Sequence, residues 1–304
     1  MRLLRRRAPA VSVEIDPAVI EPGEATAVTV RIESALDKVR EAWVEVGYEN
    51  VFAYKWVGET NAPEAVKAAD LLIANHSTAG DTRKTSAWVA VARRELPVGP
   101  DGALAPGEHR VDVTLPDDAP ASSEGLARWS VRLAVDREHA ADERAASGFR
   151  VLSPPPTAAP DELEFEHEKG ESSQVDIRLE SAGAPVGGIV KGAVVVTPKA
   201  DVAAAKVTVF LDRAEVSHPR EKVSSGRTLS WKARAAAAKN CELSVGASVE
   251  LPFELKVPDD AEPTTEALHS SVGWWVSALV DYGWSGPSNE RVRRAVIIYS
   301  DRAA

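Results

Sequence analysis

The sequence predicts an all-β protein built from two tandem antiparallel β-sandwiches. Three observations support this fold class. Short segments alternate apolar and polar side chains with a period of two, turn signals such as Pro22-Gly23 and Pro106-Gly107 separate them, and the second half of the chain repeats the pattern of the first. Because such alternation places one face of a strand in a core and the other in water, each half is expected to enclose its own core.

The predicted strands are short and evenly distributed along both halves. In the first half they are 11–15, 27–33, 42–48, 87–92, 109–115 and 129–135, and in the second 175–180, 191–197, 206–211, 249–257, 273–280 and 294–299. The last of these is a continuous apolar run, and the others alternate. Short alternating strands with turns between them are typical of immunoglobulin-like sandwiches, so each half is predicted to hold roughly seven strands.

One phrase is written once in each half. LPDDAPASSEGLARWSVRLAVD runs from Leu115 to Asp136, and VPDDAEPTTEALHSSVGWWVSALVD runs from Val257 to Asp281, about 143 residues later. In both copies a proline, which cannot donate to a strand ladder, ends one strand. A polar crossover follows, and an alternating strand returns. The repeat therefore predicts that the two halves share one folding unit.

A proline-rich stretch divides the chain near its midpoint. LSPPPTAAPDE contains three consecutive prolines, Pro154 to Pro156, which favour a stiff extended backbone. The predicted organisation is a first domain over residues 1–152, a linker over 153–161 and a second domain over 162–304.

The first half carries about 20 extra residues between Val46 and Thr85. Asn61 is a good helix N-cap, and Glu64 three residues later completes a capping-box pattern. Apolar residues then recur at helical spacing at Val66, Ala69, Leu72 and Ile73. The sequence predicts one short inserted helix over 62–75, present in the first half alone.

Composition argues against several partner classes. The net charge is −10 and the pI is about 5.2, so nucleic acid is not an expected partner. The single cysteine, Cys241, precludes an intramolecular disulfide. No apolar run has the length of a signal peptide or of a membrane span. A cytoplasmic protein is expected.

The repeated segments resemble the arrestin-like superfamily. LPDDAPASSEG followed by WSVRLAV, and PFELKVPDDAEPTTE followed by WWVSALV, are similar to a motif that arrestins carry once per sandwich. EPGEATAVTVRIE and PVGGIVKGAVVVT look like the opening strands of that family. The resemblance covers about Val11 to Tyr299 and is nearest in character to bacterial sporulation-control proteins. It implies a non-enzymatic adaptor or regulatory scaffold that binds protein partners.

The chain departs from receptor-binding arrestins at two places. Its opening strand, VSVEIDPAVIEPG, lacks the paired basic residues with which those arrestins read phosphates. The sequence also stops at DRAA, soon after Tyr299, without their long regulatory tail. Phosphate sensing and activation by tail release are therefore not expected to carry over.

Catalytic motifs are absent from the sequence. It lacks the phosphate-binding loop, the dinucleotide fingerprint, the nucleophile elbow and the zinc-protease motif, and its six histidines are scattered. We therefore expect no enzymatic activity, no cofactor and no metal. The alternative is a metal- or small-ligand-binding module, or an enzyme with a site built from loops.

Two acidic stretches are the candidates for that alternative. In ELEFEHEK, Glu162 to Lys169, alternation sets the carboxylates about 6.6 Å apart along one strand face, which favours a solvated acidic edge over a calcium site. The second stretch holds Asp136, Glu138, His139, Asp142 and Glu143, and a charged loop or single helical turn is the simpler interpretation.

Two sets of residues are candidates for partner binding. Arg5, Arg6 and Arg7 belong to a basic N-terminal cluster suited to weak contact with an anionic membrane surface, with a tail that has no binding role as the alternative. Trp274, Trp275 and Trp284 form an aromatic cluster typical of protein interfaces. The alternative for Trp274 and Trp275 is burial of both, one of them by contact between the domains.

Overall fold

The chain is all-β, as the alternating segments predict. The computed structural model describes residues 10–56, 81–217, 227–283, 286–300 and 302. Within these ranges the regular elements are strands, apart from one 3-10 turn at Pro160–Glu162. None of the described elements is a helix long and apolar enough to cross a membrane. The helix predicted over 62–75 lies outside the described residues.

The first half consists of two main sheets around one apolar core. One sheet has the order β1 (Val11–Asp16), β3 (Ala25–Ile32), β6 (Gly107–Thr114), and the other has the order β5 (Asp81–Glu95), β4 (Val39–Trp56), β7 (Ala127–Arg137), β8 (Glu143–Gly148). A short parallel pair joins β2 (Val19–Ile20) to β9 (Arg150–Val151). Inward residues of both sheets, such as Val30 and Val131, are fully buried in this core.

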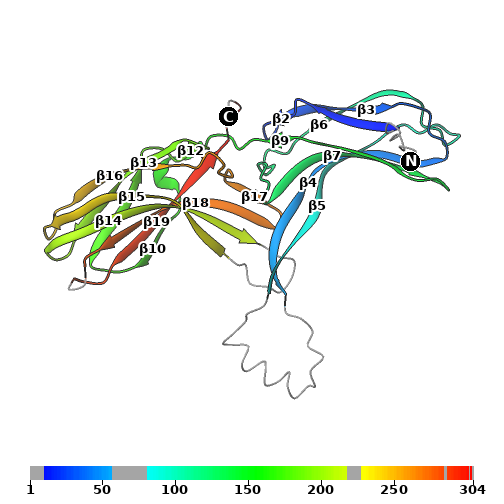
Figure 1. The fold of residues 1–304 in the computed structure, drawn as a ribbon. Helices are drawn as coiled ribbons and strands as arrows, with labels where there is room; N and C mark the ends of the chain where they lie inside the picture. The colour runs from blue at the N-terminus through cyan, green and yellow to red at the C-terminus, as the bar shows by residue number, and fades with distance from the viewer. Residues whose placement is uncertain (1–9, 57–80, 218–226, 284–285, 301, 303–304) are drawn as a thin grey trace, which may run out of the picture.

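The second half repeats this arrangement. One sheet has the order β11 (Ser173–Leu179), β13 (Ile189–Pro198), β16 (Val249–Lys256). The other has the order β10 (Phe165–Lys169), β19 (Glu290–Tyr299), β18 (Ser270–Asp281), β14 (Val202–Ser217), β15 (Arg227–Leu243). β12 (Gly183–Pro185) runs parallel to β19, and β17 (Thr265–Ala267) pairs with β18. Figure 1 shows the two halves side by side in an elongated molecule.

One long strand escaped the sequence analysis. β15 contains a run of small residues from Ala235 to Ala238, which has no apolar–polar alternation. It is a strand because β14 pairs with it along its length, from Val216↔Arg227 to Val202↔Leu243. Tertiary pairing here overrides weak local propensity.

The repeated phrase forms the same turn in each half. The carbonyl of its proline accepts a hydrogen bond from the alanine three residues later and another from a glycine at the start of the long inner strand. These bonds join Pro116 to Ala119 (3.1 Å) and Gly23 (3.2 Å), and Pro258 to Ala261 (3.1 Å) and Gly187 (3.2 Å). Both glycines have positive φ, 80° and 72°, and a Cβ there would meet the aspartate after the proline. The two copies therefore share the reason for their glycine.

A buried tryptophan then fixes the crossover in each half. The indole N–H of Trp129 donates to the carbonyl of Pro120 at 2.8 Å, and that of Trp274 donates to the carbonyl of Glu262 at 2.9 Å. Both indoles are buried, at 4% and 2% exposure. The repeated phrase is thus a folding unit in which the returning strand holds the loop that precedes it.

The crossovers also exchange side chains between the halves. Leu126, from the first half, is 1% exposed and belongs to the core of the second half. Ala267, from the second half, is 6% exposed and belongs to the core of the first. β17 accordingly lies beside β4 and β7 at the junction (Figure 1). Each core is completed by a residue from the other half.

Candidate functional site

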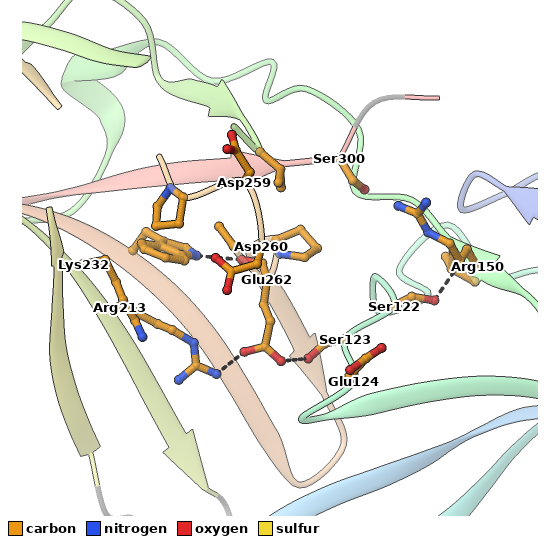
Figure 2. Close-up of a pocket in the computed structure, with 16 residues that line it drawn as sticks. Ser122, Ser123, Glu124, Arg150, Arg213, Lys232, Asp259, Asp260, Glu262 and Ser300 are labelled. Atoms are coloured by element: carbon orange, nitrogen blue, oxygen red, sulfur yellow. Dashed lines mark hydrogen bonds and ion pairs between the residues drawn. The ribbon is translucent and has the colours of Figure 1, made fainter. Parts of the chain in front are cut away.

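A cavity of about 710 Å³ opens at the junction of the two halves (Figure 2). Both halves contribute charged residues to its walls. The first half supplies Glu124 and Arg150, and the second supplies Arg213, Lys232, Asp260 and Glu262. A cavity with both signs of charge and walls from two halves is the principal candidate site.

The loops that form this cavity are held by their own halves. In the first half, the carbonyl of Ser123 accepts from the backbone N–H groups of Leu126 and Ala127, at 3.3 and 2.9 Å. In the second half, the indole of Trp274 holds the carbonyl of Glu262. Because each loop is fixed before the halves meet, the polar side chains on it are preorganised.

One carboxylate joins the halves across the cavity, and we call its contacts the Glu262 junction. One oxygen of Glu262 accepts from the hydroxyl of Ser123 and from the backbone N–H of Gly125, the latter at 3.1 Å. The other oxygen pairs with Arg213, whose second terminal nitrogen lies 2.9 Å from Glu215. Figure 2 shows Ser123 and Arg213 on either side of this carboxylate. The junction is a charge-assisted network between the halves.

The pKa of Glu262 lies below its ordinary value of 4.5. Burial acts to raise this pKa, but the hydrogen bond from Ser123 and the charge of Arg213 together outweigh it. Because folding lowers the pKa, the ionised carboxylate stabilises the fold fully at pH values above 4.5. That contribution is lost as the pH falls through the lowered value.

Replacing Glu262 by glutamine tests this linkage. Glutamine keeps the shape but loses the charge, so Glu262→Gln is expected to lower the free energy of unfolding by about 1–2 kcal/mol near neutral pH. The difference from wild type is expected to shrink as the pH falls below 4.5. Urea unfolding at several pH values measures both effects. Glu124→Gln is the control, because Glu124 lines the same cavity, is exposed and has no ion pair among the described residues. An equal loss in both variants would contradict the assignment.

A buried amide closes the junction beneath the cavity. Asn50 is 0% exposed, and its side-chain NH₂ donates to the carbonyl of Leu126 at 3.0 Å and to the hydroxyl of Ser270 at 2.8 Å. Its side-chain oxygen accepts from the backbone N–H of His269 at 2.7 Å. Ser270 in turn donates to the carbonyl of Val51 at 2.8 Å. A single β4 side chain therefore bonds the turn between β17 and β18.

Four charged side chains of the cavity remain without an ion-pair partner in the described part of the chain. They are Arg150 and Lys232, which are basic, and Glu124 and Asp260, which are acidic. Arg150 and Lys232 come from opposite walls in Figure 2, from β9 and from β15. All four are exposed. The arrangement is suited to a polar ligand that offers charges of both signs.

The two described tryptophans of the predicted aromatic cluster are buried. Trp274 is 2% exposed and packs in the core of the second half, where it also reaches the cavity wall. Trp275 points to the opposite face of the sheet and is 7% exposed, with the guanidinium of Arg293 5.2 Å from its ring centre. Neither indole is an exposed aromatic contact, and burial of both is the outcome stated as the alternative. Arg5, Arg6, Arg7 and Trp284 lie outside the described residues.

The two acidic stretches are engaged in ion pairs. Glu168 pairs with Arg293 at 2.7 Å and with Arg291 at 3.2 Å, and Glu166 also pairs with Arg293. His167 lies 3.0 Å from the buried carboxylate of Glu290. In the second stretch, which is a charged loop between β7 and β8, Asp136 pairs with Arg40 at 2.7 Å. Over the described ranges, no three His, Cys, Asp or Glu side chains are grouped to hold a metal ion.

Sequence reasoning missed Asn50, Ser123, Arg213 and Glu262. One signal for Glu262 was present. The repeated phrase reads PDDAP in the first copy and PDDAE in the second, so Pro120 and Glu262 occupy the same position. Both carbonyls serve the local fold, and the carboxylate of Glu262 alone is free to bond the other half.

Comparison with protein-family models finds no matching family, and a search of curated proteins finds no match.

Proposed function

We propose that the protein is a non-enzymatic adaptor or regulatory scaffold of the arrestin-like type, similar to sporulation-control proteins and acting in the cytoplasm. In this proposal two tandem sandwiches hold a protein partner at the cavity between them. The observation that carries it is the cavity itself. Both halves build it, and it presents Arg150, Lys232, Glu124 and Asp260 without ion-pair partners among the described residues.

The chemistry of the cavity favours a polypeptide ligand. A segment of a partner protein supplies charges of both signs together with backbone donors and acceptors. The unpaired side chains come from opposite walls, so such a segment contacts both halves at once (Figure 2). Complementary charge of this kind contributes mainly to specificity and to the rate of association. Preorganised loops reduce the entropy lost on binding.

Charge reversal at the two walls tests the proposal. The double variant Arg150→Glu, Lys232→Glu is expected to retain specific partners at least about tenfold less well than wild type, since each lost charge contact weakens binding. Quantitative capture from native lysate measures the retention. The matched control is Arg110→Glu, Arg178→Glu, which reverses two exposed charges outside the cavity (73% and 63% side-chain exposure). If wild type retains no specific partner, the adaptor function is wrong. If the cavity variant retains every partner, the cavity is not the site.

The cavity volume also supports a second candidate, a small polar ligand. About 710 Å³ lies within the range of roughly 300–1,000 Å³ typical of small-molecule sites. A ligand that binds only the native state raises the melting temperature. Titration with inorganic phosphate and with divalent cations, read as a melting shift that the Arg150→Glu, Lys232→Glu variant abolishes, would favour this candidate over the adaptor.

A further inference from the structure

We propose that the free edge of β15 binds an acidic, extended segment of a partner protein, which adds to the sheet as a further strand. The inference rests on the proposed adaptor function and names a second docking surface for it. Three independent features of β15 carry the proposal: an open backbone edge, an exposed tryptophan and a row of unpaired cations.

The backbone edge of β15 is open over a long distance. β15 has 17 residues and stands at the end of its sheet, with β14 as its hydrogen-bonded neighbour. In the described part of the chain, no other segment forms backbone hydrogen bonds with β15. A row of unpaired N–H and C=O groups is what strand addition requires, because main-chain hydrogen bonds then supply the affinity.

The internal repeat provides a comparison for the exposed tryptophan. Trp88 on β5 and Trp231 on β15 occupy the same position of the two repeats. The indole of Trp88 is engaged: the guanidinium of Arg132 lies 3.5 Å from its ring centre, and its N–H donates to Glu45 at 3.1 Å. The side chain of Trp231 is 69% exposed and contacts Phe210 at 5.3 Å between ring centres. Among the described residues its N–H has no acceptor, so Trp231 offers an unoccupied aromatic surface.

A row of cations continues from Trp231 along the same face. The register sets Trp231 opposite Asp212, Arg234 opposite Phe210, and Lys239 opposite Lys206. Because these β14 residues are separated by even numbers of positions, their side chains and their cross-strand partners share one face of the sheet. The two register shifts within β15 keep its cations in line despite their uneven spacing.

These cations lack carboxylate partners in the described part of the chain. Arg234, Lys239 and Lys206 are all exposed, and none forms an ion pair there. Like charges directly opposite each other, as at Lys206 and Lys239, destabilise a strand pair. An anion bound between them would remove that repulsion, and this in a chain whose net charge is −10.

Charge complementarity selects the occupant. A second copy paired through the same edge would bring these cations against one another, so self-pairing is disfavoured. A strand with carboxylates on alternate residues places each of them on the cationic face, since side chains on one face recur every two residues. An apolar residue of that strand then covers Trp231. The same strand bears Lys232 on the cavity wall, so the two docking surfaces are continuous.

The test uses the full chain and a capped ten-residue peptide of alternating glutamate and valine. Fluorescence anisotropy is expected to show binding of this peptide and none of a lysine–valine peptide of equal length. Two backbone-methylated forms, one methylated on every glutamate nitrogen and one on every valine nitrogen, examine the ladder directly. A strand pairs through one edge at a time, so one form is expected to bind as the parent does and the other at least about tenfold more weakly.

Variants locate the site on β15. Trp231→Ser and the double variant Arg234→Glu, Lys239→Glu are each expected to weaken binding of the glutamate–valine peptide about tenfold, as for an interface anchor. Lys84→Glu, at an exposed position on the equivalent edge strand β5, is the matched control and is expected to change binding less than about twofold. All these side chains are exposed, so the melting temperatures should match wild type.

Several outcomes would overturn the proposal. Equal binding of both methylated peptides would mean that charge attraction, and not strand addition, holds the peptide. Tighter binding of a ten-residue oligothymidine would make nucleic acid the ligand, and a dimer dissociated by Trp231→Ser would make a second copy the occupant. If the peptide fails while capture still depends on Arg150 and Lys232, the β15 proposal is wrong and the adaptor function stands. If capture fails as well, both are wrong.

Discussion

Replacing Trp274 by alanine is expected to lower the free energy of unfolding by about 3–5 kcal/mol, the usual range for a large buried aromatic side chain. The indole is 2% exposed in the core of the second half and also donates to the carbonyl of Glu262. The substitution therefore leaves a core cavity and frees the loop that carries the Glu262 junction. Urea unfolding followed by circular dichroism measures the change.

Phenylalanine at the same position separates the two contributions. Trp274→Phe keeps most of the apolar contact but removes the N–H donor, so a loss of about 1–2 kcal/mol is expected from the unpaired carbonyl. Trp129→Phe is the matched variant, because Trp129 makes the same bond to Pro120 in the other half. If both phenylalanine variants were as stable as wild type, the indole bonds would have no part in fixing the crossovers.

Replacing Asn50 by leucine is expected to lower the free energy of unfolding by about 3 kcal/mol and to weaken the cooperation between the halves. Leucine has a similar volume but leaves the buried N–H of His269 and the hydroxyl of Ser270 without this partner. Each buried polar group left unpaired costs about 1–3 kcal/mol. Calorimetry is the suitable measurement, because separate unfolding of the halves appears as two transitions.

Gln174→Leu provides the control for Asn50→Leu. Gln174 is exposed on β11, so the same change of an amide to an apolar side chain should alter stability by no more than about 0.5 kcal/mol. A loss confined to Asn50→Leu supports its role between the halves. Comparable losses in both variants would assign the effect to leucine itself.

The strands were predictable because burial on one face imposes a period of two on the sequence. Val28 and Val30 on β3, and Val131 and Leu133 on β7, are buried at every second position as the pattern predicts. β15 was missed because its alanines suit either face. The opposite orientations of Trp274 and Trp275 also followed from the period, but whether the outer face was covered did not. Arg293 lies over Trp275, and its position depends on pairing between β18 and β19.

The Glu262 junction was beyond sequence reasoning for a different reason. Ser123 and Glu262 are separated by 139 positions, and their contact depends on how two complete halves dock. Local propensity carries no information about that docking. The difference between Pro120 and Glu262 in otherwise matched copies marks a position released from the shared folding role, but it does not identify the partner.

The exchange of Leu126 and Ala267 has a consequence for the history of this duplicated chain. Two copies that once folded alone would each have closed their own core. Here each copy lends a side chain to the other, so a fragment ending in the proline-rich linker would carry an uncovered leucine, and its counterpart would have a hole where that leucine belongs. The copies have become obligate halves of one folding unit, and neither can be recombined with other modules without repair at this point.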